Sequence, residues 1–340
     1  SHHVGEKRFT PDGWWGGVEQ VDADDYFPVP VEDAKLFAQM KADFSLSRKS
    51  NQSGLSLVLP YIQEEVTADK LSEHVISEYF WPILGGQLEV EILEEEHLRL
   101  IDSKSVHENL DQLILPEKID QISPSIALAY KALTKDDYPR VKLHLPNSPS
   151  LPKWDKDYLP KEIATTIHKE LTKIDGFIRV RCPLYVEKNG LTGAEHAETS
   201  YFDMFLSKDV TDAARKPEFV REGIIIPEDR VPKVRGYTAM VVIGPGALAT
   251  LLGDSENPAH TEWEKNATKF KGKYKWGPTT IDFVRLSVGK FLNLMNQGDD
   301  EEDVAILSDI FYLNPPKDNV EKPVSERKIE VKCELGWSHS

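Results

Sequence analysis

The sequence has few of the features that mark several large classes of protein. It holds only two cysteines, Cys182 and Cys333, which is too few for a disulfide framework or a cysteine-rich zinc site. No stretch approaches the roughly 18 apolar residues of a membrane-spanning helix. The amino terminus lacks the charged-then-apolar pattern of a secretory signal. These absences predict a protein of the reducing cytoplasm with no membrane partner.

Basic blocks and phosphate-binding glycine motifs are also missing. The net charge is −16 and no run of five basic residues occurs, which argues against nucleic acid as a partner of this segment alone. A local basic face is still open, for example at Arg179 and Arg181 on one side of an expected strand. There is neither a G-x-G-x-x-G nor a GK[ST] motif. We therefore expect no cofactor in this chain and no binding of ATP by the chain itself.

The composition is that of a globular protein with more than one domain. Hydrophobic residues make up 40% and charged residues 29% of the 340 positions. The proline-rich stretch 145–152 predicts a linker, which gives three expected parts: residues 1–145, 153–315 and 316–340. The first residue is serine rather than methionine, so we expect a tag remnant or an internal piece of a longer protein.

Residues 53–92 predict a strand–helix–strand unit. Leu55, Leu57 and Leu59 alternate with other residues, as in a half-buried strand. Thr67 is a candidate cap for a helix that we expect to stop at Pro82. A second strand is predicted over 88–92. The class expected for the whole chain is α+β.

The second half predicts alternating helices and strands. Pro160 is a typical first residue of a helix, and Asn189-Gly190 of a turn. Strands are predicted over 178–186, 200–207 and 236–244, helices over 124–133, 211–220, 247–252, 279–297 and 301–313, and a final strand-like run over 328–334.

We expect the chain to be organised around residues 252–264. Gly253 is predicted to end the preceding helix in a left-handed conformation. The loop then gathers polar groups and one tryptophan in a rigid frame set by Pro258. The candidate residues for a coupling or contact role are Asp254, Glu256, Asn257, His260, Glu262 and Trp263, with Arg221 and Glu222 from the segment upstream.

Two interpretations of this loop stay open. It is either a contact element facing another domain or a well-capped polar connection with Trp263 packed beneath. A metal site is disfavoured, because one histidine with carboxylates and no cysteine is a poor zinc set and no calcium-loop spacing is present. For Arg221 and Glu222, an intramolecular ion pair is the ordinary alternative to a charge offered to phosphate or a partner.

A different chemistry is suggested near the carboxyl terminus. Glu330 and Lys332 form an E-x-K pattern on an expected strand, with Asp309 upstream, as in nucleases that hold Mg²⁺ on paired carboxylates. The pattern also arises by chance in any charged protein. The competing interpretation is an exposed strand of alternating charge.

The order of these elements resembles a known superfamily. The run "SGLSLVLPYIQEEVTADKLSEHVISEYFWPILGGQLEVEI" is similar to the closing part of the nucleotide-binding domain of the GHKL ATPases, which include gyrase B, heat-shock chaperones, histidine kinases and MutL. The runs "LYVEKNG", "SYFDMFLSKD", "FVREGIIIPEDRVPKVRGYTAMVVI" and "GDSENPAHTEWE" are similar to the middle, or transducer, domain of the chaperone members and to uncharacterised prokaryotic members.

The resemblance implies a specific architecture and role. It covers roughly residues 50–315 and implies the edge of a Bergerat-type nucleotide domain followed by an α/β sandwich of the transducer type. The superfamily's catalytic Glu, Mg-binding Asn, Asp-x-Gly-x-Gly turn and glycine-rich lid have no counterpart in this sequence. ATP and Mg would thus belong to upstream residues of a parent chain, which would be one partner. A second copy in a homodimer would be another. A scaffold module without nucleotide chemistry remains the alternative.

Overall fold

The structure, a computed structural model, describes residues 2–4, 7–9, 17–22, 25–49, 51–59, 65–173, 175–190 and 197–296. The chain divides into two compact units, Ser1–Thr67 and Ala68–Ser340. The helix predicted over 301–313 and the strand predicted over 328–334 lie outside the described residues.

The first unit consists of short elements. Its elements are β1 (His2–Val4), β2 (Lys7–Phe9), β3 (Gly17–Asp22), β4 (Asp25–Val29) and α1 (Ala34–Asp43), in which β1 pairs with β2 and β3 with β4. The Asp33 carboxylate accepts hydrogen bonds from the first turn of α1. No residue of 17–22, 25–49, 51–59 or 65–67 is buried.

The first strand of the predicted strand–helix–strand unit is wrong. Residues 51–59 pair with no strand in the described structure. Leu55, Leu57 and Leu59 are 75–81% exposed. An alternating pattern specifies a strand only where a neighbouring strand and a core exist to receive it. Among the described residues this segment has neither.

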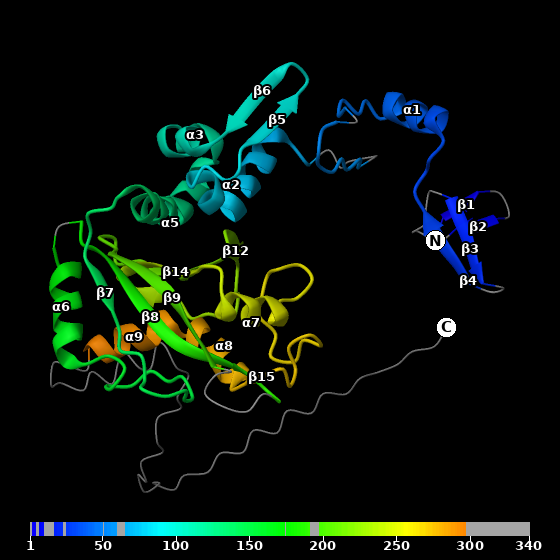
Figure 1. Cartoon of the computed structure of the whole chain (residues 1–340). Coiled ribbons are helices and arrows are strands. Elements are labelled where there is room, and N and C mark those ends of the chain that lie inside the picture. The colour runs from blue at the N-terminus through cyan, green and yellow to red at the C-terminus, as the bar shows by residue number, and fades with distance from the viewer. Residues whose placement is uncertain are drawn as a thin grey trace, which may run out of the picture. The chain divides into compact units, whose positions relative to one another are not determined.

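The second unit is built on a mixed seven-stranded sheet, visible in green and yellow in Figure 1. The order is β12-β11-β14-β9-β8-β15, and β7 also pairs with β8. The pairs β11–β14 and β7–β8 are parallel and the others are antiparallel. The strands are β7 (Arg140–Lys142), β8 (Phe177–Lys188), β9 (Ala197–Lys208), β11 (Glu218–Arg221), β12 (Ile224–Ile226), β14 (Tyr237–Ile243) and β15 (Tyr274–Lys275).

Helices cover both faces of this sheet (Figure 1). One face carries α2 (Ala68–Leu84), α3 (Ser103–Glu108), α4 (Leu110–Leu113) and α5 (Pro116–Thr134), together with the hairpin of β5 (Val90–Glu94) and β6 (His97–Ile101). The other carries α6 (Lys161–Leu171), α7 (Ala247–Ser255), α8 (Gly277–Arg285) and α9 (Ser287–Asn296). A small ribbon of β10 (Ala214–Arg215) and β13 (Val234–Arg235) lies outside the main sheet. The predicted α+β class is confirmed, and the main sheet lies between two helical layers.

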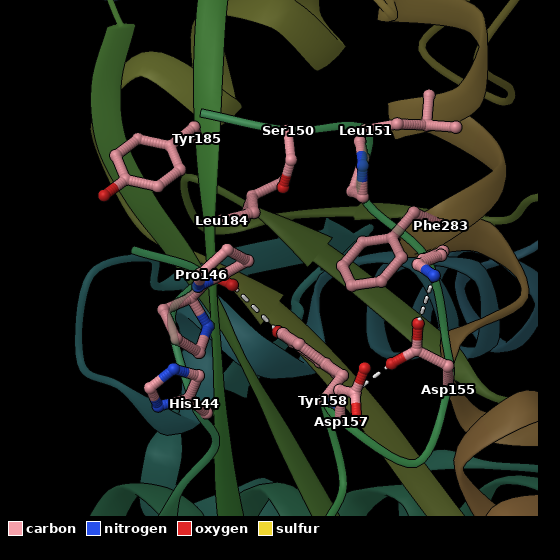
Figure 2. Close-up of a pocket in the computed structure, with 13 residues that line it drawn as sticks. His144, Pro146, Ser150, Leu151, Asp155, Asp157, Tyr158, Leu184, Tyr185 and Phe283 are labelled. Atoms are coloured by element: carbon pink, nitrogen blue, oxygen red, sulfur yellow. Dashed lines mark hydrogen bonds and ion pairs between the residues drawn. The ribbon is translucent and has the colours of Figure 1, made fainter. Parts of the chain in front are cut away.

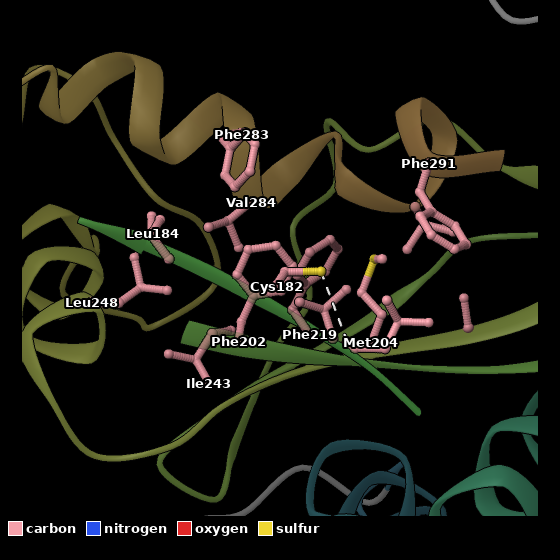
Figure 3. Packing of buried hydrophobic residues seen from close by; sticks show 14 of the residues in the cluster. Cys182, Leu184, Phe202, Met204, Phe219, Ile243, Leu248, Phe283, Val284 and Phe291 are labelled. Carbon is pink, nitrogen blue, oxygen red and sulfur yellow. Dashed lines mark hydrogen bonds between the residues drawn. The ribbon is translucent and has the colours of Figure 1, made fainter. Parts of the chain in front are cut away.

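The alternation along the strands explains why the sheet has two cores. In β8, Ile178, Val180 and Cys182 are fully buried under the α6–α9 layer, while Phe177 packs under the α2–α5 layer. Figure 3 shows Cys182 among aromatic side chains of the first of these cores. Each fully buried side chain of this size contributes about 1.5–3 kcal/mol of transfer free energy. The predicted strands 178–186, 200–207 and 236–244 and the helix after Pro160 are confirmed.

The helix predicted over 211–220 is wrong. The segment forms β10 and β11 instead. Phe219 packs in one core and Val220 in the other, an alternation that only a strand produces.

Three predicted helix ends also differ. Gly253 lies inside α7 rather than after its end, and a Cβ there would be in ordinary contact with the Arg221 guanidinium, 3.4 Å away. Pro82 lies inside α2, which contains a non-helical residue at Tyr79 and continues to Leu84. The single helix predicted over 279–297 is two helices, α8 and α9, joined at Leu286.

The division of the chain differs from the linker predicted at 145–152. The units divide between Thr67 and Ala68. The strands on either side of the proline-rich stretch, β7 and β8, are parallel neighbours in one sheet. The prolines therefore belong to a connection over the edge of a single sheet.

Candidate functional site

The predicted loop begins in α7 and returns as a tight turn over the sheet. Residues Glu256 and Trp263 form an antiparallel bridge, and the Asn257 amide donates to the Glu262 carbonyl at 3.1 Å. Trp263 is fully buried and meets Phe219 edge to face, with ring centroids 5.5 Å apart. The loop is anchored in the core by this tryptophan.

Glu256 is the centre of the polar contacts. Its side chain is 1% exposed, and its two oxygens accept hydrogen bonds from Nε and Nη2 of Arg221, the second at 2.8 Å. The Nδ1 atom of His260 lies 2.6 Å from one oxygen and Trp263 Nε1 lies 3.3 Å from the other. Burial raises the pKa of the Glu256 carboxyl, but hydrogen bonds from Arg221 and His260 outweigh it, so the pKa lies below its ordinary value.

Two side chains at the rim of this pair face solvent. Glu222 accepts a hydrogen bond from Arg221 Nη1 and is 42% exposed, while the His260 side chain is 55% exposed. Both residues have left-handed backbones, with φ of 49° and 55°. Non-glycine residues in this region carry strain and are concentrated at functional sites. The Glu222 amide also donates to the Ile243 carbonyl at 2.9 Å, which ties the end of β11 to the end of β14.

A second buried ion pair, between Glu228 and Arg285, holds the backbone of Trp263. Glu228 accepts from Arg285 Nε at 2.7 Å and from the Trp263 amide at 2.5 Å. Arg285 also donates to the Trp263 carbonyl. Glu228 and Arg285 are functional-loop contacts that no sequence motif singled out. Their pairing joins α8 to a loop 57 positions away, and no local pattern signals that separation.

The remaining candidates do not join the Glu256 contacts. Asp254 accepts from Lys273 and from Tyr274 Oη at 2.5 Å. Glu262 pairs with Arg230 at 3.0 Å. Asn257 bonds within its own turn, through Thr261. These residues fix the outside of the loop.

The chemistry available to this cluster is limited by its own hydrogen bonds. Four donors surround the Glu256 carboxylate, so it is poorly suited to act as a general base. Among the described residues, no three histidine, cysteine or acidic side chains are grouped to hold a metal ion. We define the Glu256 cluster as Arg221, Glu222, Glu256, His260 and Trp263. It presents a fixed arrangement of charge at the ends of two parallel strands.

The other sequence candidates have simpler outcomes. Arg179 and Arg181 both pair with Asp203, at 2.7 and 2.9 Å, so their charges are partly neutralised. The nuclease candidates Asp309, Glu330 and Lys332 lie outside the described residues.

Within the part of the chain that the structure covers, no helix has both the length and the apolar character needed to span a membrane. The chain matches no family model, no curated protein and no solved structure.

Proposed function

We propose that this chain is a coupling part of a GHKL-type ATPase, in which the Glu256 cluster contacts a nucleotide-binding domain formed by upstream residues of the parent chain. ATP and Mg would be held there, and closure of a homodimer would be one output. The observation that carries the proposal is the Arg221–Glu256 ion pair, which locks the end of β11 to the loop after α7. It fixes Glu222 and His260 at the surface.

A fixed charged surface suits a coupling role. A surface that is already ordered loses little conformational entropy when a partner binds. The binding free energy is then spent on the contact itself and not on ordering the loop.

The test is ATP turnover by the full-length parent protein carrying Glu222→Ala and His260→Ala together. Coupling free energies of 1–3 kcal/mol correspond to about 5- to 150-fold, and we expect a loss of turnover or of dimer closure in that range. Asp229→Ala is the matched control, because this carboxylate is close in sequence, 88% exposed and outside the Glu256 cluster. Unchanged turnover and closure in the double variant would reject the coupling role.

A scaffold function without nucleotide chemistry is the second candidate. It is favoured by the first unit, whose described hydrophobic residues, such as Val21, Phe27 and Phe37, are largely exposed and available to a protein partner. The two functions differ in what precedes this sequence in the parent. An Asn-bearing helix followed by Asp-x-Gly-x-Gly and measurable ATP turnover would support the first. A parent without them would support the second.

A further inference from the structure

A cavity of about 220 Å³ lies between the segment 144–158, β8 and α8. None of its lining residues belongs to the Glu256 cluster. Figure 2 shows the side chains that surround it, with Tyr158 and Phe283 on two sides and Pro146 and Leu184 on the others. The lining is mostly apolar, with a few polar groups at the rim, which is the usual character of a small-molecule site.

The aromatic walls of this cavity are held in place. Tyr158 Oη donates a hydrogen bond to the Pro183 carbonyl at 2.9 Å. The Phe283 ring stacks on Trp154, with centroids 4.8 Å apart, and Trp154 Nε1 donates to the Phe283 carbonyl at 2.9 Å. Both walls therefore exist before any ligand arrives. Binding would require little reorganisation.

The sheet itself leaves room at this place. On one side, β8 pairs with β7 at residues 179–181 and with β15 at residues 187 and 188. Between these two ladders no described strand borders β8 on that side. Pro183 lies in this gap and has no N–H to donate, while its carbonyl is already bonded to Tyr158. The gap in the ladder coincides with the cavity.

The rim carries one more negative charge than positive, with Asp155 and Asp157 against Lys153. The Asp155 carboxylate is paired with Lys153 at 2.7 Å. The Asp157 carboxylate acts on the same Lys153 electrostatically, from beyond ion-pair distance. His144 and Tyr185 also line the cavity. The two aspartates therefore give the rim its net negative charge.

We propose that this cavity binds a small aromatic amine, with its ring beside the Tyr158 and Phe283 rings, which meet edge to face with centroids 5.4 Å apart, and its ammonium group at Asp157. A dry cavity of about 150 Å³ is known to hold benzene in another protein, so the present volume suits a single ring with a short side chain. It falls below the range of about 300–1,000 Å³ that holds drug-sized ligands. This site is independent of the ATPase proposal.

The test uses three matched probes at pH 8: phenethylamine, neutral 2-phenylethanol and anionic 3-phenylpropionate. Binding is measured by calorimetry and by shifts of the Leu184 and Tyr185 amide signals in ¹⁵N-labelled protein. We expect saturable binding of phenethylamine with a Kd below about 1 mM. The anion should bind about fivefold more weakly or worse.

Three variants assign the site. Leu151→Trp places a large ring at the rim, where Leu151 is 45% exposed, and should weaken phenethylamine at least about tenfold. Leu133→Trp, at an exposed position on α5, should leave binding unchanged. Asp157→Asn should weaken the amine about two- to fivefold and leave 2-phenylethanol unaffected. Absence of saturable amine binding, or binding that survives Leu151→Trp, overturns the site. Equal affinity for the anion overturns the assigned ligand class.

Discussion

The guanidinium group of Arg221 faces the carboxylate of Glu256 across 35 positions of sequence, joined by two parallel hydrogen bonds. Their side chains are only 10% and 1% exposed. Such a bidentate pair is geometrically specific. Removing both charges from water is costly, so the pair contributes little net stability. Removing one partner, however, leaves the charge of the other buried and unpaired.

Glu256→Ala should therefore be strongly destabilising. Breaking a buried ion pair by removing one partner costs about 3–5 kcal/mol. The matched control is Glu262→Ala in the same loop, where the partner Arg230 is 64% exposed and water can replace the pair. That change should cost less than about 1 kcal/mol. Urea unfolding of both variants measures the difference, and similar losses in the two would mean that the Glu256 cluster does not hold the loop.

Two glutamates should respond to pH in opposite ways. Burial raises the pKa of Glu218, and the hydrogen bond from Ser125 Oγ at 3.2 Å only partly offsets it. The folded pKa lies above the unfolded value, so this group lowers stability as pH rises from about 4.5 through the folded pKa. Glu218→Gln should then stabilise the protein at pH 7. Glu256→Gln should destabilise it.

The sign for Glu256 is reversed because its folded pKa is lowered. Its contribution is present above the unfolded pKa and is lost as pH falls through the folded one. Unfolding free energies of the wild type and both variants between pH 3 and 8 test the pair. A Glu218→Gln protein less stable than the wild type at pH 7 would contradict the assignment.

Limited proteolysis should cut first near the division of the two units rather than in the proline-rich segment. Residues Glu65, Val66 and Thr67 are exposed and precede the first buried helix. The segment 145–152 lies instead over the cavity. Subtilisin digestion followed by mass spectrometry should give a stable product that begins near Ala68. An earlier cut within 145–152 would restore the linker interpretation.

The sequence predicts best those strands and helices that bury one face in a hydrophobic core. The apolar residues of β8 recur at every second position because one layer of helices covers that face. The helix after Pro160 likewise buries Ile167 and Leu171 at helical spacing. In both cases local periodicity and tertiary burial agree.

The failures come from context that a local pattern does not contain. Residues 211–220 include good helix formers, yet Phe219 and Val220 are drawn into opposite cores by β14 and β12. The split between α8 and α9 has no glycine or proline signal. There Arg285 pairs with Glu228, which is distant in sequence.

The candidate site was predicted in part. The burial of Trp263 beneath the loop and the intramolecular ion pair between Arg221 and Glu222 match expectations drawn from residue types near a strand end. What the sequence could not supply is which carboxylate meets Arg221. Asp254, Glu256 and Glu262 are all carboxylates of the same short loop. Only the geometry of the turn buries Glu256 and leaves the other two partly exposed.

The late pairing of β15 with β8 has a consequence for synthesis of the protein. Lys188 of β8 pairs with Tyr274 of β15, which is synthesised about 86 residues later. β8 and β9, in contrast, are close enough in sequence to form a hairpin early. At translation rates of about 5–20 residues per second, the far end of the β8 edge stays unpaired for roughly 4–17 s on the ribosome. During this interval the unpaired edge of β8 can pair with another copy of the chain.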